Sequence, residues 1–301
     1  MNHSISSVIF TLFLFSAPLA ASSDAGTRQP AVDGTFYPPD PEELASLIEF
    51  YLSAADNAPS LVKIIGIIAP HAGYSYSGQV AAHAYRAIEG CDFDTVVLMG
   101  PSHRVRFDGA SAGNFTAYAT PLGGVEVDET LVRALIEENK DISFLPEAHA
   151  GEHCIEVQLP FLKSVLEDFS IVPILFGDRS IETCESVARS LLKATGGKKV
   201  LFIASSDLSH FHSHRKAFKM DHDTIEGILT LRGTSFLEEV NSGTYELCGA
   251  SAVATLMLIT EALDGTESKL LHYANSGDVL RGSRSSVVGY ASVIFTQKAK
   301  P

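Results

Sequence analysis

The chain has 301 residues, 46% of them hydrophobic, and this length allows one large domain or two small ones. Its formal net charge is −14, from 36 acidic and 22 basic residues. An acidic surface argues against nucleic acid as a partner, because nucleic-acid binding needs clustered Lys and Arg. The 4 cysteines are too few for a disulfide scaffold, so each is interpreted as a small buried residue or a ligand.

The first 23 residues have the pattern of a secretory signal peptide. An apolar run from Ser7 to Phe15 precedes small residues at 17–23. No Lys or Arg precedes the run and no A-x-A triplet follows it, so an uncleaved anchor or a misassigned start is the alternative. We therefore expect a periplasmic or extracellular protein if the signal is real, and a cytoplasmic one otherwise. No later stretch is long and apolar enough to span a membrane.

Strand-like and helical patterns alternate along the rest of the chain. The first predicted helix begins at Pro41, with Asp40 as its N-cap. Further helices are predicted at 77–89, 128–138, 155–166, 181–193 and over most of 216–264. Predicted strands cover 64–70, 95–102, 142–144, 171–176, 200–204, 270–274 and 287–294. This alternation predicts a single α/β domain over 28–301, with a central, mostly parallel sheet and helices on both faces.

Three of the predicted strands end at residues that can bind metal or move protons. His71 follows the strand at 64–70, and His103 follows the strand at 95–102. Asp207 and His210 come just after the strand at 200–204. Open α/β sheets bind ligands at the carboxyl ends of their strands, so these side chains should meet at one edge. A lone histidine at a strand end is usually structural, but three such ends indicate a functional cleft, and imidazole suits iron, copper or zinc.

The third metal ligand stays open on spacing alone, with Glu246, Cys248 and Asp207 as candidates. Two His and one carboxylate are typical of non-haem iron(II), whereas two His and a thiolate favour zinc or a softer site. Cys248 leads into an apolar helix, and a helix N-terminus is expected to lower the pKa of a nearby thiol. A packed core thiol is the equally good alternative.

Two further polar clusters are candidates for the same edge. Glu152 and His153 come just before a predicted helix and could reach the cleft, although Glu152 could instead complement the helix dipole. His210, His212 and His214 form a short histidine-rich tract, which can bind metal or be a solvated loop. Of these three we select His210, because it follows a strand and has an acidic neighbour.

Residues Gly109–Gly113 match the G-x-S-x-G pattern of serine hydrolases, with Ser111 as the nucleophile. That motif needs a strand before it and a helix after it. The segment at 114–121 looks extended instead, which favours a structural serine. No G-x-G-x-x-G sequence and no P-loop is present, so a nucleotide cofactor is not expected.

Six segments together resemble the MEMO family, called AmmeMemoRadiSam system protein B in prokaryotes. In family order they cover 31–38, 68–74, 100–103, 152–156, 205–210 and 248–249. The fold of this family is similar to that of class III extradiol ring-cleaving dioxygenases, which use iron(II). By resemblance, His71, His103 and Cys248 are the metal ligands, and Asp207 and His210 share their cleft.

The resemblance implies a metal-dependent redox enzyme with iron favoured, and with copper or zinc as the alternatives. His210 would act as general acid or base, oriented by Asp207, on a small-molecule substrate or peptide. Cys248 stands where the dioxygenases use a carboxylate, which weakens the expectation of ring cleavage because a thiolate changes the charge and redox behaviour of the metal. Two other functions stay open: a non-catalytic metal- or peptide-binding protein, and a zinc-dependent hydrolase.

Overall fold

The structure, a computed structural model, describes residues 26–56, 63–230, 232–263, 266–280 and 283–297. The predicted signal peptide at 1–23 lies outside these ranges. In the described part of the chain no helix is both long and apolar enough to cross a membrane. The cysteines are all free thiols: Cys91, Cys154, Cys184 and Cys248.

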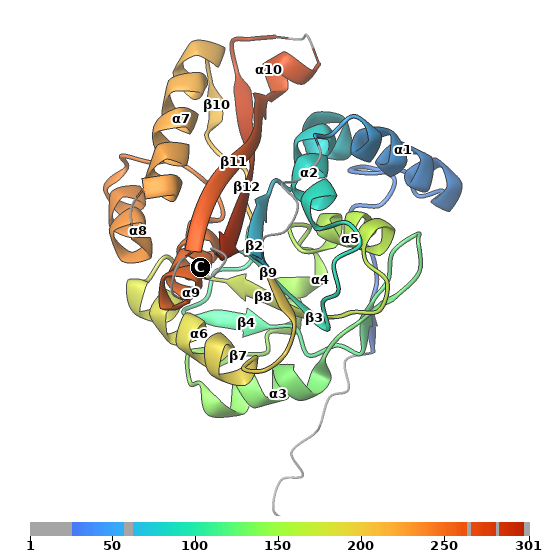
Figure 1. Cartoon of the computed structure of the whole chain (residues 1–301), viewed down its shortest axis with the longest axis vertical. Coiled ribbons are helices and arrows are strands. Elements are labelled where there is room, and N and C mark those ends of the chain that lie inside the picture. Colours follow the sequence, from blue (N-terminus) through green and yellow to red (C-terminus); the bar gives the residue numbers. More distant parts are fainter. Residues whose placement is uncertain (1–25, 57–62, 231, 264–265, 281–282, 298–301) are drawn as a thin grey trace, which may run out of the picture.

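A 9-stranded mixed sheet with a parallel centre organises the molecule (Figure 1). Its central strands run in the order β2 (Lys63–Ala69), β9 (Val200–Ser205), β3 (Thr95–Pro101) and β8 (Ser170–Phe176), each parallel to its neighbours. These strands are nearly continuous apolar runs, because both of their faces are covered. Their carboxyl ends therefore form one edge, as the sequence predicts.

Antiparallel strands extend this parallel centre on both sides. Beside β2 lies β12 (Val287–Gln297), which in turn pairs with β11 (Thr266–Asn275) and with the short β10 (His210–His212). Beside β8 lies β4 (Ala110–Ala112), followed by β7 (Ile142–Ser143). A separate 3-stranded sheet consists of β1 (Thr27–Arg28), β5 (Ala117–Tyr118) and β6 (Val125–Glu126).

Helices cover both faces of the sheet (Figure 1). One side carries α1 (Pro41–Ser53), α2 (Tyr74–Ile88) and α5 (Leu159–Val165), which pack on one another. The other side carries α6 (Ile181–Ala194), α7 (His214–Thr230), α8 (Gly233–Ser242) and α9 (Ala250–Ala262). The shorter or peripheral helices are α3 (Glu129–Glu138), α4 (Pro146–Ala150) and α10 (Ser276–Val279). The predicted fold class, a single α/β domain with helices on both faces, is confirmed. The sheet is mixed where a mostly parallel one was predicted, because antiparallel strands extend the parallel centre on both sides.

Local signals account for most helix ends, and tertiary contacts account for the exceptions. The Asp40 carboxylate accepts the N–H groups of Glu42 and Glu43 at 3.1 and 2.9 Å, as predicted for an N-cap. The predicted helix at 155–166 instead begins as a 3-10 turn over Glu156–Gln158 before α5. The carboxylate of Glu156 is fully buried and accepts hydrogen bonds from the N-terminal segment, which fixes this turn.

Ser111 is a structural serine and not a hydrolase nucleophile. It lies in β4, its side chain is 0% exposed, and β5 follows instead of a helix. Its hydroxyl accepts the N–H of Leu145 at 3.0 Å and lies 3.1 Å from Nε2 of His149. Tyr118 completes the group, with its hydroxyl 3.0 Å from Nδ1 of His149.

The buried His149 should make the protein less stable in mild acid. Burial lowers the pKa of His149 from 6.5 to about 3, so the folded protein keeps it neutral while the unfolded chain protonates it. Neutral His149 contributes its full stabilisation to the folded protein above pH 6.5. This contribution is lost as the pH falls towards 3, and about 2 kcal/mol of it is lost by pH 5. Urea titrations should show a shallower decline between pH 6.5 and 5 for His149→Gln than for the wild type or His214→Gln. Equal slopes in all three proteins would contradict this assignment.

Candidate metal centre

Two strand-end histidines and one cysteine meet at the carboxyl edge of the parallel strands. His71 follows β2 and His103 follows β3, and their ring centroids are 5.1 Å apart. Cys248 lies just before α9, with Sγ 3.1 Å from Nε2 of His71. One ligand atom from each of the three residues lies within 4.8 Å of the others. This is close to the spacing of atoms that share one ion at about 2.0–2.3 Å.

A buried hydrogen-bond relay fixes the tautomer of His71. The hydroxyl of Ser205 donates to the carbonyl of Cys154 at 2.7 Å and accepts from the side-chain amide of Gln158 at 2.8 Å. It also lies 2.8 Å from Nδ1 of His71, where it has no proton left to give. Nδ1 therefore carries the proton, and the Nε2 lone pair faces Cys248. Burial lowers the pKa of His71 well below its usual value, so the ring is neutral as a ligand must be.

Glu152 orients His103 in the same way. Its carboxylate lies 2.9 Å from Nδ1 of His103 and also accepts the backbone N–H of that residue at 2.7 Å. A carboxylate that only accepts places the proton on Nδ1 and leaves Nε2 free, as in metal sites where a carboxylate supports a histidine ligand. Burial alone would raise the pKa of Glu152, but the hydrogen bonds from His103 hold it well below its usual range. Glu152 thus orients a candidate ligand.

Cys248 is held against the sheet as a half-buried thiol. The neighbouring Gly249 permits this, since a Cβ there would lie 2.4 Å from the carbonyl oxygen of Ser205. The N–H of Asp207 donates to Sγ at 3.2 Å. The expectation of a lowered thiol pKa is wrong for the metal-free chain: burial, and then the charge of Asp207, raise it to about 12. A bound cation would reverse this, because it binds the thiolate.

Asp207 and His210 reach the same region but are held by different partners. Asp207 is buried and accepts the N–H of His71 at 2.8 Å, and burial raises its pKa to about 6. His210 lies close enough for its charge to lower the pKa of His71. Glu246, a candidate ligand by sequence, lies outside the ligand cluster, where it accepts the N–H of His210 and bonds Nε2 of His212, both at 2.8 Å. Among the described residues no hydrogen bond joins the side chains of Asp207 and His210.

His153 is the third imidazole of the site. Its ring stacks on His103 with centroids 4.8 Å apart and lies 5.4 Å from the ring of His71. With His103 and Glu152 it forms a second group whose ligand atoms lie within 4.8 Å of one another. Burial lowers the pKa of His153 to about 4, so it is neutral near pH 7. His103 belongs to both groups and links them.

An aromatic cavity of about 470 Å³ opens beside His153 and Asp207. Its aromatic walls are Phe36, Tyr76, Phe211 and Tyr290. Phe211 is 76% exposed and has φ +61°, the one positive value among the described residues other than glycine. A bulky residue in this region is strained, and Glu246 holds the residues on both sides of it. Phe211 thus presents an exposed ring to this cavity.

Substitutions at Phe211 should reverse the usual order of alanine and glycine. Only glycine adopts a positive φ without strain, so Phe211→Gly should be more stable to urea than Phe211→Ala by about 1 kcal/mol. A matched pair at the exposed Phe50 in α1, Phe50→Gly and Phe50→Ala, should show the opposite order. The prediction fails if alanine is the more stable residue at both positions.

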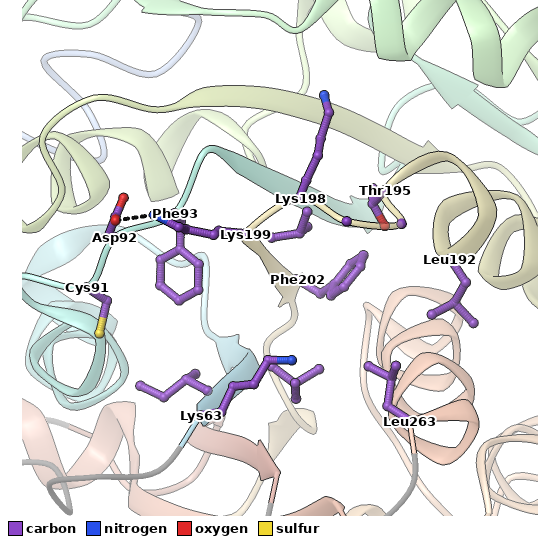
Figure 2. A pocket seen from close by; sticks show the side chains of 15 residues that line it. Lys63, Cys91, Asp92, Phe93, Leu192, Thr195, Lys198, Lys199, Phe202 and Leu263 are labelled. Atoms are coloured by element: carbon purple, nitrogen blue, oxygen red, sulfur yellow. Dashed lines mark hydrogen bonds and ion pairs between the residues drawn. The ribbon is translucent and has the colours of Figure 1, made fainter.

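Another cavity, of about 550 Å³, lies at the opposite end of the parallel strands (Figure 2). It surrounds the start of β2 and β9, with Phe93, Phe202 and Leu263 among its walls. Figure 2 shows Lys199 bonded to Asp92. Neither a candidate ligand nor any predicted proton-transfer residue lines this cavity. Although this cavity is larger than the aromatic one, its lining offers none of the chemistry predicted for the functional site.

The fold and this cluster define an α/β protein with a candidate His-His-Cys metal centre at the strand ends. A family model described as Memo-like protein matches residues 28–294. A MEMO1 family protein of Methanopyrus kandleri is 37% identical over 281 residues, covering 89% of this chain and 98% of its own. Another from Methanobrevibacter smithii is 38% identical over 280 residues, covering 89% and 99%. The chain belongs to the Memo-like family, as its motifs indicate.

One solved structure also resembles the chain at the level of overall shape. It is an uncharacterized protein of Escherichia coli K12, with a TM-score of 0.49 and 13% identity, and the match covers 77% of this chain and 99% of that one. A similarity this distant carries no functional information.

Proposed function

We propose that this Memo-like protein is a metal-dependent oxidoreductase that holds iron, or copper in its place, through His71, His103 and Cys248. The observation that supports this most is the fixed state of both imidazoles. Ser205 and Glu152 engage their Nδ1 atoms, so both Nε2 lone pairs are available beside the thiol of Cys248. Imidazoles with oriented partners and a nearby thiol suit a soft or borderline transition metal.

The chain's own residues would bind the substrate and transfer protons. A bound iron or copper ion would supply Lewis acidity and electron transfer. The aromatic cavity would exclude water from a small-molecule substrate or a peptide side chain, and Asp207 lines that cavity. His210 would move protons as general acid or base. Its backbone is held by Glu246, which keeps it beside the ligand cluster.

Elemental analysis of untagged protein, purified anaerobically without chelator, tests the metal. We expect stoichiometric iron or copper in the wild type and in the control His214→Ala, whose histidine pairs with Asp278 outside the cluster. Stoichiometric zinc would favour the hydrolase, since zinc has no redox chemistry and His and Cys are its usual ligands. Absence of all three metals would refute the proposal.

Turnover separates an enzyme from a binding protein with the same pocket. Oxygen uptake and product formation would be followed with catechol-like and small cyclic substrates, aerobically and anaerobically. We expect His210→Ala to keep its metal and to lose turnover by about 100-fold or more, the range for general acid–base catalysis. A metal-loaded wild type that turns over no substrate class would favour the non-catalytic metal- or peptide-binding protein.

We also propose that the protein is exported through its N-terminal segment. The support is the apolar run and the small residues at 17–23. Fractionation of the native host, with N-terminal sequencing of the mature chain, tests this. A cytoplasmic chain that starts at Met1 would contradict it.

A further inference from the structure

A second cavity adjoins the candidate ligands, and its chemistry differs from that of the aromatic one. It has a volume of about 340 Å³, within the range of small-molecule sites. His103 and Cys248 form part of its wall, so it reaches two of the three candidate ligands. Arg106 and Arg179 line the same cavity. Two cationic side chains thus face the space beside the proposed metal.

These two arginines are available to a ligand. Both are exposed, and within the described ranges neither guanidinium forms an ion pair or donates a side-chain hydrogen bond. Other arginines do have such partners, as Arg28 has in Glu156, Arg133 in Glu129 and Arg189 in Glu185. Arg104 and Arg215 also lack an ion pair among the described residues, so what sets Arg106 and Arg179 apart is that they line the same cavity.

Among the described residues, the one acid in the wall of this cavity forms no ion pair with either arginine. Asp178 accepts the N–H of Gly109 on Oδ2 at 2.6 Å and the N–H of Ser180 on Oδ1 at 2.9 Å. Both of its oxygens are thus committed to the backbone. The cavity carries two positive charges against this one engaged carboxylate, in a chain of net charge −14. The overall field repels anions, so a cationic cavity would concentrate them at this place.

The other polar groups in the wall leave the guanidinium groups as the main donors. The hydroxyl of Ser102 donates to the carbonyl of Val105, and that of Ser251 donates to the carbonyl of Asp178, both at 2.7 Å. Gly177 lets this wall pack closely against Phe107, since a Cβ there would lie 2.2 Å from the carbonyl oxygen of Phe107. The first turn of α9 also borders the cavity and adds a partial positive charge.

We propose that this cavity binds an oxyanion of the substrate, a carboxylate or a phosphate, through Arg106 and Arg179. Arginine binds such groups in a bidentate manner, which fixes orientation as well as position. An oxyanion held here would place the rest of the molecule against His103 and Cys248. The inference rests on the proposed function in one respect, because it takes the anion to belong to the substrate of that centre.

Anion binding to the full-length protein, as purified, tests this inference. Inorganic phosphate and succinate would be titrated calorimetrically at constant ionic strength, and metal content would be measured in the same samples. We expect Arg106→Gln and Arg179→Gln each to weaken binding about tenfold or more, because hydrogen bonds to charged groups are lost. Arg106→Lys should retain part of the affinity. The control Arg189→Gln removes an equal charge from the exposed face of α6 and should change it less than about twofold.

The affinities for phosphate and for succinate are compared, since both anions would bind the same two arginines. The anion that binds more tightly indicates whether the site takes a phosphate or a carboxylate. Failure of the wild type to bind either anion would overturn the inference, as would unchanged affinity in both Arg→Gln variants. Arginine-dependent binding in a protein without stoichiometric metal would support the anion site and contradict the proposed function. Loss of anion affinity together with loss of metal in the Arg→Gln variants would also overturn it, because the arginines would then act through the ligands.

Discussion

A Cys248→Ser variant is expected to lose metal affinity by about 100-fold or more. Removal of a partner that only orients a ligand already costs 10–100-fold, and a serine hydroxyl does not ionise near pH 7 to replace the thiolate. Metal content after dialysis and competition with a chromophoric chelator would measure the loss. In cobalt-loaded protein, the thiolate-to-metal charge-transfer absorption should be present in the wild type and absent from the variant.

Cys91→Ser is the matched control for this substitution. Cys91 is a partly exposed thiol in the cavity at the opposite end of the strands, so its loss should leave metal content and absorption unchanged. Full metal occupancy with an intact absorption band in Cys248→Ser would exclude Cys248 as a ligand. A different result would make Cys248 a structural neighbour of the site. In that case Cys248→Ser would lose its metal, but the cobalt-loaded wild type would show no thiolate band.

A Glu156→Ala variant is expected to lose about 3–5 kcal/mol of unfolding free energy. Glu156 is 0% exposed and pairs with the buried Arg28. It also accepts the hydroxyl of Tyr37 at 2.6 Å and the N–H groups of Ala31 and Val32 at 2.7 and 3.0 Å. Removing the carboxylate leaves a buried charge and three donors without their acceptor, which is costly. Urea denaturation followed by circular dichroism would measure it.

Glu129→Ala provides the comparison for this ion pair. Glu129 lies four residues before Arg133 on the surface of α3, and such exposed pairs contribute about 0.3–0.5 kcal/mol. A loss in Glu156→Ala no larger than that in Glu129→Ala would show that water replaces the carboxylate. Glu156→Ala should also bind metal more weakly, because it removes the partner of Arg28. Arg28 donates to the carbonyls of His149 and Glu152 and so holds the segment that orients His103.

Patterns that repeat along the chain made the fold predictable. The strands that precede His71, His103 and Asp207 are apolar runs buried on both faces, so their type and their common edge follow from composition. Short strands such as Ala110–Ala112 and His210–His212 escaped prediction. A strand of three residues is too short to show an alternation of apolar and polar side chains. These strands form because a longer neighbouring strand offers hydrogen bonds.

The supporting contacts of the candidate centre were harder to predict than its ligands. Motif order brought together His71, His103 and Cys248, but nothing local marks Ser205 or Gln158 as the partners that orient His71. These two bonds join residues 134 and 47 positions apart in the chain, and they depend on register in the sheet. The raised pKa of Cys248 was missed for a related reason. Burial raises the thiol pKa more than the helix N-terminus lowers it, and burial depends on the tertiary structure.

The position of β12 has a consequence for how the chain folds during synthesis. The strand that leads to His71 lies between β9 and β12, whose residues are made more than a hundred positions later. Until residues 287–297 leave the ribosome, one edge of that apolar strand lacks its native neighbour and can pair with other chains. Contacts so distant in sequence also slow folding. We therefore expect nascent chains that stop before β12 to aggregate, and the edge that carries the candidate metal ligands to be assembled only after β12 has been made.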